Sequence, residues 1–156
     1  MSKIYEAIVI AKWIINKIHP EPLKLQKLLY LAQGYSYAFY DRPLFKDELE
    51  GWVHGPVVRE VYNVFKDYQY NRINIDFKID EIDKEAEDVL NYVINNFSKY
   101  DAKYLEELSH GQEPWILSRK GLDPDERSDK TITKESISEY FISEVFQPEV
   151  EAWDWW

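Results

Sequence analysis

The sequence contains no cysteine. That absence excludes disulfides, thiolate metal sites and cysteine nucleophiles, and it is typical of proteins of the reducing cytoplasm. No stretch approaches the roughly 18 consecutive apolar residues that a membrane span needs. Residues 1–6 also lack the charged start and long apolar run of an export signal. We therefore expect a soluble, cytoplasmic protein that makes no membrane contact.

The charge of the chain is strongly negative and unevenly distributed. The net charge is −10; residues 1–50 carry seven Lys/Arg and six Asp/Glu, whereas residues 51–156 carry twelve and twenty-three. An acidic surface repels phosphate backbones, which argues against direct nucleic-acid binding and favours a basic protein partner. Plain solubility explains the same charge equally well. Aromatic residues make up 16% of the 156 residues, which supplies enough apolar mass for one folded domain.

Apolar residues recur mainly at three- and four-residue steps, which predicts a mainly α fold. We expect one compact domain of about six helices over residues 1–147, followed by an aromatic and acidic tail over residues 148–156. Gly34 interrupts the second helix without ending it and permits a neighbouring helix to approach closely. The expected helices run from a cap at Ser2 to just before His19, from Pro22 to Phe39, from Pro56 to Tyr68, from Ile82 to Phe97, from a cap at Asp101 to His110, and from a cap at Thr133 to just before Pro148.

One segment departs from the helical pattern. Ile73, Ile75, Phe77 and Ile79 alternate with polar residues, and a period of two indicates a strand. A strand without a partner is marginal, so we interpret this segment as an extended connector. The alternative is a small two-stranded β element near residues 50–54 and 72–79.

No motif for catalysis or metal binding rises above background. His19, His54 and His110 are isolated from one another, and no pair has the i, i+4 spacing of a helical zinc site. Residues 51–55 contain two glycines but lack the lysine of a phosphate-binding loop. We expect no catalytic residue, no metal and no cofactor. An enzyme that uses His110 with a nearby carboxylate remains as the weaker alternative.

Features that suit protein binding are more prominent. Lys24 and Lys27 are three residues apart, so they share one side of the second helix, which we expect to be exposed. Trp153, Trp155 and Trp156 lie among carboxylates in the tail. Such tryptophans either fold back over the helical core or anchor the tail in a partner.

Several blocks of this sequence together resemble the Panacea domain, the domain of SocA-like antitoxins and phage-associated GepA-like proteins. Their order and spacing match over roughly residues 5 to 145. The blocks are Leu25-Gln26-Lys27-Leu28-Leu29-Tyr30, Pro43-Leu44-Phe45, Trp52, Gly55-Pro56-Val57-Val58 with Val61-Tyr62, and Ser109-His110 with Glu113-Pro114-Trp115.

The resemblance implies a helical, non-enzymatic antitoxin of a bacterial or phage-infected cell that binds and neutralises a toxin protein encoded next to it. The alternative is a phage-encoded inhibitor of a host defence protein that mimics nucleic acid through the acidic run from Asp76 to Asp88. By resemblance, the architectural positions are Trp52, Gly55, Pro56, Pro114 and Trp115. Candidates for partner contact are Lys24, Gln26, Lys27, Tyr30 and His110, together with the three tail tryptophans; the polar ones among them suit an internal network equally well.

Overall fold

The computed structural model describes residues 3–146, and these residues form a mainly α fold, as predicted. Within this range no helix is long and apolar enough to cross a membrane. The tail, residues 148–156, lies outside the described residues. The helices are α1 (Ala7–Ile18), α2 (Pro22–Tyr40), α3 (Arg59–Phe65), α4 (Lys84–Phe97), α5 (Ala102–His110), α6 (Glu113–Ser118) and α7 (Lys134–Val145), with a 3-10 turn η1 (Lys66–Tyr68) after α3. The strands are β1 (Leu49–Trp52), β2 (Gly55–Val57) and β3 (Thr131–Ile132).

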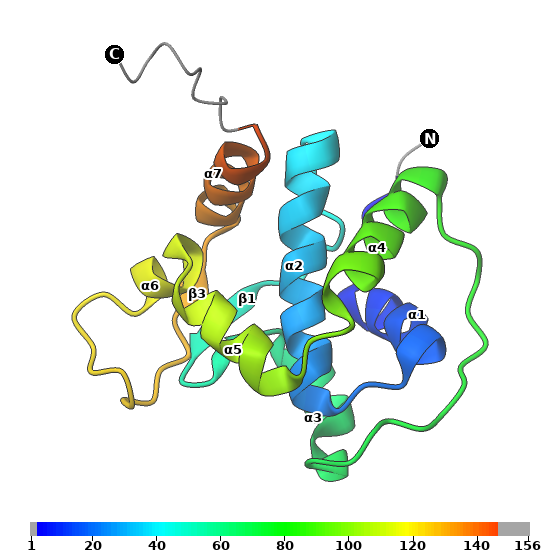
Figure 1. The fold of residues 1–156 in the computed structure, drawn as a ribbon, viewed down its shortest axis with the longest axis horizontal. Helices are drawn as coiled ribbons and strands as arrows, with labels where there is room; N and C mark the ends of the chain where they lie inside the picture. Colours follow the sequence, from blue (N-terminus) through cyan, green and yellow to red (C-terminus); the bar gives the residue numbers. More distant parts are fainter. Residues whose placement is uncertain (1–2, 147–156) are drawn as a thin grey trace.

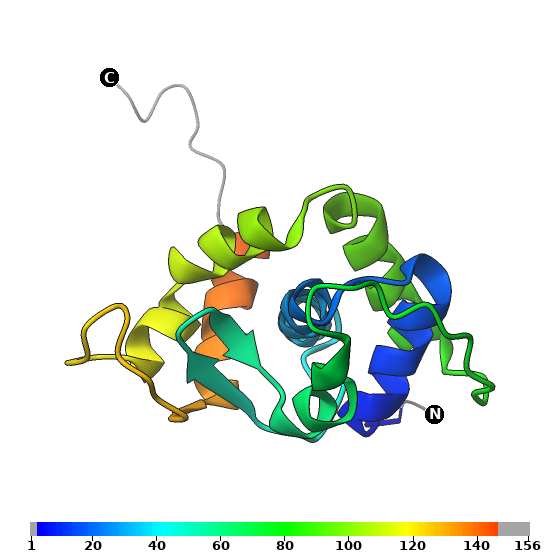
Figure 2. The same cartoon turned by 90° about the horizontal axis from the view of Figure 1, so that it is seen from below.

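Helix α2 is the centre of the molecule. It contacts α1, α3, α4, α5, α7 and β2, and Figure 2 shows it nearly end-on with these elements around it. Thirteen of its nineteen residues are buried. A helix that is covered on all sides must bury polar positions too, and each of these then needs a hydrogen-bond partner. Gln33 meets this need by accepting from the backbone N–H groups of Leu44 and Phe45 and donating to the Phe45 carbonyl.

The three strands form one antiparallel sheet in the order β2-β1-β3. The hairpin β1–β2 pairs Trp52 with Gly55 across a two-residue turn, and Leu49 pairs with Ile132 of β3. A strand near residues 50–54 is thus confirmed, but the pairing with residues 72–79, given as the alternative, is wrong. β1 pairs with β2 because the two-residue turn between them closes at little cost in chain entropy, whereas pairing with residues 72–79 would close a longer loop.

Residues 71–83 instead form the extended connector that we expected. Its backbone is held by partners other than strands. Ile73 donates to the Pro20 carbonyl, and the Asn16 side chain makes two hydrogen bonds to the backbone of Phe77, at 2.7 and 2.9 Å. Ile73 is buried, and Phe77 and Ile79 pack against the core without forming a ladder, whereas Ile75 is exposed.

Helix ends follow the predicted caps in the second half of the chain. Asp101 accepts a hydrogen bond from the N–H of Tyr104 at 2.8 Å, and Thr133 accepts one from Ser136 at 3.1 Å. Acidic Asp83 caps α4 in the same way. The segment around Trp115, for which no helix was predicted, is helix α6.

Two predicted helix starts are wrong. Helix α1 begins at Ala7, because the backbone of Tyr5 is paired with Leu44 and Lys46 in an extended bridge. Ser2 lies outside the described residues. Helix α3 begins at Arg59 rather than at Pro56, because residues 55–57 belong to β2.

The expectation for Gly34 is confirmed. A methyl group at this position would overlap the ring of Phe141 in α7, so the absence of a side chain lets the ring pack directly on α2. Figure 1 shows α7 beside α2, with the two helices running in the same general direction.

Candidate protein-binding site

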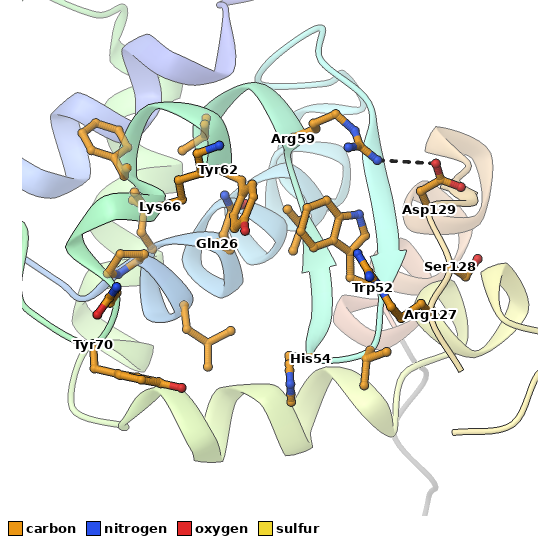
Figure 3. Close-up of a pocket in the computed structure, with 18 residues that line it drawn as sticks. Gln26, Trp52, His54, Arg59, Tyr62, Lys66, Tyr70, Arg127, Ser128 and Asp129 are labelled. Atoms are coloured by element: carbon orange, nitrogen blue, oxygen red, sulfur yellow. Dashed lines mark hydrogen bonds and ion pairs between the residues drawn. The ribbon is translucent and has the colours of Figure 1, made fainter. Parts of the chain in front are cut away.

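A groove of about 1120 Å³ opens at the N-terminal end of α2. We call it the hairpin groove. Its walls are the start of α2, the β1–β2 hairpin, helix α3 with η1, and the loop at residues 127–129 that leads to β3 (Figure 3). Apolar side chains of α2 and α3 form its floor, among them Leu25, Val61 and Phe65. A concave surface of this kind suits a protruding segment of another protein.

One wall of the groove is a fixed aromatic and cationic surface. The indole N–H of Trp52 donates to Glu50 at 2.8 Å, and Arg59 holds the same carboxylate with two hydrogen bonds, at 2.8 and 3.1 Å. The Arg59 guanidinium lies 5.3 Å from the centre of the Trp52 ring. On the other side the ring of Tyr62 packs edge-on against Trp52 at 4.8 Å. Because each side chain constrains the next, this surface is ordered before any partner binds.

The charge of the groove is opposite to that of the chain. Its charged lining consists of Arg59, Lys66 and Arg127 with a single carboxylate, Asp129, which lies 3.5 Å from Arg59. Within residues 3–146, neither Lys66 nor Arg127 forms an ion pair. A concave surface with unpaired cations attracts acidic groups, in contrast to the basic partner that the overall charge favours.

Two tyrosines expose aromatic surface in the groove. The exposed fraction is 38% for Tyr62 and 94% for Tyr70. Tyr70 stands at the edge of the groove opposite Arg127 and Asp129 (Figure 3). Tyrosine combines apolar area with a polar tip, which is why it is common in protein interfaces.

The polar residues predicted on α2 are buried or half-buried rather than on an exposed face, and Gln26 also lines the groove. The Gln26 side chain accepts from the N–H of Val58 at 2.8 Å and donates to its carbonyl at 3.2 Å. Lys27 is 1% exposed, so the prediction of an exposed side shared with Lys24 is wrong. Lys24 itself is half-buried and donates to the Ser98 carbonyl at 2.6 Å. The spacing of the two lysines says nothing of what covers them: Lys24 reaches Ser98 after α4, and Lys27 reaches Pro56 in β2.

Lys27 connects α2 to strand β2 of the hairpin. Its ammonium group donates to the Pro56 carbonyl at 2.9 Å. Burial lowers the pKa of Lys27 to about 7, and the nearby carboxylate of Glu106 opposes this shift. Gly55 has a φ of +106°, and a methyl group there would lie 2.7 Å from Cε of Lys27 and 2.8 Å from the Ser109 hydroxyl. The absence of a side chain at Gly55 thus leaves room for Lys27 and Ser109, and Pro56 belongs to β2 rather than to the start of a helix.

The remaining predicted residues hold α5 and α6 against the hairpin. The Trp115 indole N–H donates to the Trp52 carbonyl at 2.7 Å, and the ring of His110 stacks on Trp115 at 4.1 Å. Tyr30, fully buried, donates to the Gln112 side chain at 2.7 Å. Pro114, in the first turn of α6, is buried as well.

His110 lies close to other titratable groups without forming a metal site. Burial lowers its pKa, while Glu106 and the Val53 backbone act in the opposite direction. Its Nε2 atom is buried and has no hydrogen-bond partner. Exposed His54 lies 3.0 Å from the same Glu106 carboxylate. Among residues 3–146 no group of three or more His, Asp or Glu side chains is placed to hold a metal ion.

The predicted site residues thus differ in where they lie: some make internal hydrogen bonds, and others line the groove. Gln26, Lys27 and Tyr30 belong to an internal polar network, the reading that the sequence left open beside partner contact. Trp52, predicted as architectural, also lines the groove. The three tail tryptophans, Trp153, Trp155 and Trp156, lie outside the described residues.

Arg59 and Tyr62 of α3, and Lys66 at the start of η1, were not among the residues predicted to contact a partner. Arg59, Tyr62 and Lys66 are spaced three and four residues apart, so they occupy one side of the helix. That spacing, close in sequence to Trp52, is the signal that could have indicated these three residues. Arg127 carries no comparable signal, because a loop brings it to the groove.

Comparison with known proteins gives one match. A family model described as "Antitoxin SocA-like, Panacea domain" matches residues 25–116. The matched range covers α2, the hairpin, α3 and the internal polar network, and it stops before the loop that supplies Arg127. No curated protein and no solved structure matches the chain.

Proposed function

The chain belongs to the family of SocA-like antitoxins with a Panacea domain, and on that premise we propose that it binds a toxin protein and neutralises it by direct contact, without chemistry of its own. The toxin is the product of a neighbouring gene in a bacterial or phage genome. The hairpin groove is the surface that contacts it. The observation that carries this proposal is the fixed arrangement of Trp52, Arg59 and Tyr62 beside an apolar floor.

The composition of that surface supports protein binding. Trp, Tyr and Arg are the residue types that most often dominate the energy of protein interfaces. Their contribution is larger when the side chains are already ordered, because less conformational entropy is lost on binding. Arg59 and Trp52 satisfy this condition through their shared partner Glu50.

The internal network supports the same proposal indirectly. Gln26 and Lys27 hold backbone groups of residues 56–58, and Trp115 holds the backbone of Trp52. These hydrogen bonds fix the two ends of the hairpin and the start of α3. In this proposal they shape the groove, and they need no catalytic role.

The alternative of a nucleic-acid mimic receives less support. In the acidic run Asp76–Asp88, four of the seven carboxylates pair with cationic side chains of the same chain. Asp76 lies 2.8 Å from His19, and Arg42 holds both Asp83 and Glu85. A mimic would present such charges to its target instead.

The test is neutralisation of the protein encoded next door. That protein is expressed alone and together with this chain in a bacterial host, growth is followed, and the complex is purified. We expect growth arrest by the neighbour alone, rescue on co-expression, and a stable complex. Trp52→Ala and Arg59→Ala should each weaken the complex by about 10- to 100-fold, as loss of a dominant interface residue does.

Tyr104→Ala is the matched control, since Tyr104 is an exposed aromatic residue of α5 outside the groove. It should leave both rescue and affinity unchanged. Circular dichroism confirms that every variant is folded. Rescue without a complex, or groove variants that bind as tightly as the unmodified chain, would contradict the proposal.

A further inference from the structure

The segment that follows α7 has an unusual composition. Residues 147–156 contain three tryptophans and no Lys or Arg. Their carboxylates are Glu149, Glu151 and Asp154. Exposed tryptophans are costly in water, so a segment of this kind gains stability when an apolar surface takes them up.

The hairpin groove is complementary to that segment in both charge and surface. It offers the cations Lys66 and Arg127, which have no ion-pair partner within the described residues, beside the exposed rings of Tyr62 and Tyr70. We propose that the hairpin groove of one copy of this chain binds residues 147–156 of a second copy. The tryptophans pack on the floor and the tyrosines, and the carboxylates pair with the cations.

The position of α7 favours a second copy over the same chain. Phe141 packs at Gly34, and α7 continues from there toward the C-terminal end of α2, whereas the groove lies at the N-terminal end (Figures 1 and 3). At 1.5 Å per helical residue, Phe146 lies about 20 Å from the level of Gln26 along α2. The chain from Phe146 to Trp153 spans at most about 25 Å when fully extended. To place all three tryptophans in the groove of its own chain, the segment would have to run almost fully extended as far as Trp153, which costs conformational freedom, whereas a segment bound to a second copy is under no such constraint.

When two copies lie side by side with their α2 helices antiparallel, the segment of each copy need not be fully extended to reach a groove. Such an arrangement places the end of each α7 beside the groove of the other copy, so that both segments are bound by one two-fold axis. Three tryptophans from each copy bury on the order of 1,000 Å² together, before the surface of the groove itself is counted. That area falls in the range of specific protein interfaces.

The test is sedimentation velocity of the full chain without any toxin, over concentrations from about 1 to about 100 µM. Two combined variants are compared with the unmodified chain. The tail variant carries Trp153→Ser, Trp155→Ser and Trp156→Ser, and the groove variant carries Lys66→Glu and Arg127→Glu. We expect a concentration-dependent dimer for the unmodified chain and at least tenfold weaker association for each variant.

Mixing the two variants gives the sharpest readout. The tail variant keeps an intact groove and the groove variant keeps an intact tail. A dimer of one copy of each therefore has one intact contact, so an equimolar mixture should associate more strongly than either variant by itself. A control with Lys99→Glu and Lys120→Glu makes the same charge change at exposed lysines outside the groove. The control should associate like the unmodified chain.

Three outcomes would overturn the proposal. One is an unmodified chain that stays monomeric over the whole range, and another is a tail variant that associates as well as the unmodified chain. The third comes from hydrogen exchange of the dilute monomer: protection of residues 59–70 that disappears in the tail variant would place the segment in the groove of its own chain. The toxin is proposed to occupy the same groove, so it would compete with the segment of the second copy. Toxin binding is measured separately, by growth rescue and by purification of the complex, so either proposal can fail while the other stands.

Discussion

The ammonium nitrogen of Lys27 lies 2.9 Å from the carbonyl oxygen of Pro56, and neither residue is exposed. This hydrogen bond joins the central helix to the hairpin that forms one wall of the groove. A buried ammonium group is costly unless it is paired or loses its proton. Here the pKa of Lys27 falls to about 7, so the neutral amine can still donate to Pro56 while the cost of burying a charge is reduced.

The first prediction concerns the pH dependence of stability. Between about pH 7 and pH 10 the unfolded chain keeps the proton of Lys27 whereas the folded chain has lost it, so the free energy of unfolding should rise with pH. Below pH 7 both states are protonated, and this contribution is constant. We expect a gain of about 3 kcal/mol over that window. Urea unfolding at a series of pH values measures it.

The control for that experiment is a pair of variants. Lys27→Met should remove the rise with pH, and Lys24→Met, a half-buried neighbour on the same helix, should keep it. The series stops at pH 10 because the buried tyrosines, whose pKa values are raised, destabilise the fold above that pH. An equal slope in the Lys27→Met variant would show that other groups cause the dependence.

The second prediction concerns Gly55. Gly55→Ala should destabilise the fold by about 2–4 kcal/mol, because alanine is strained at a φ of +106° and its methyl group meets Lys27 and Ser109. Gly121→Ala is the matched control, since Gly121 has a φ of +86° and open space around it. The difference between the two losses, measured by chemical denaturation, reports the packing against Lys27. Equal losses would mean that the contact is not tight.

The third prediction concerns Gly34. Alanine favours a helix over glycine by about 1 kcal/mol, yet Gly34→Ala should lower the free energy of unfolding by about 1–2 kcal/mol because the methyl group overlaps the ring of Phe141. Gly111→Ala places its methyl group 3.6 Å from the nearest atom and should be neutral or stabilising. Thermal unfolding of both variants distinguishes the two effects. Stabilisation by both would refute the close packing of α7 on α2.

Helices with a clear apolar side could be predicted from the sequence. The caps at Asp101 and Thr133 and the apolar side of α4 are local features, and local features determine where these helices begin. The start of α3 was misplaced because proline suits both the first turn of a helix and a strand edge. Residues 55–57 form a strand rather than a first helical turn because they pair with β1, and such pairing cannot be read from the spacing of residues.

The groove could be predicted only in part, for the same reason. The spacing of Lys24 and Lys27 shows that they share a side of α2 but says nothing of what covers that side. Burial of Lys27 follows from the hairpin and α5, which come from distant parts of the chain. Arg127 reaches the groove through a loop, so neither periodicity nor family resemblance indicates it.

The fourth prediction separates binding from stability at one residue of the groove. Tyr70 is 94% exposed, so its side chain contributes little to the folded state and Tyr70→Ser should change the free energy of unfolding by less than about 0.5 kcal/mol. If a toxin fills the groove, the same ring becomes buried in the interface, and its loss should weaken toxin binding by about tenfold or more. Tyr104→Ser, at a ring that is 46% exposed and stacked on Tyr100, should leave the affinity unchanged. Isothermal titration of the purified toxin against both variants measures the difference. An unchanged affinity for Tyr70→Ser would show that the toxin does not contact this edge of the groove. The variants of Trp52 and Arg59 then decide whether the toxin binds in the groove at all.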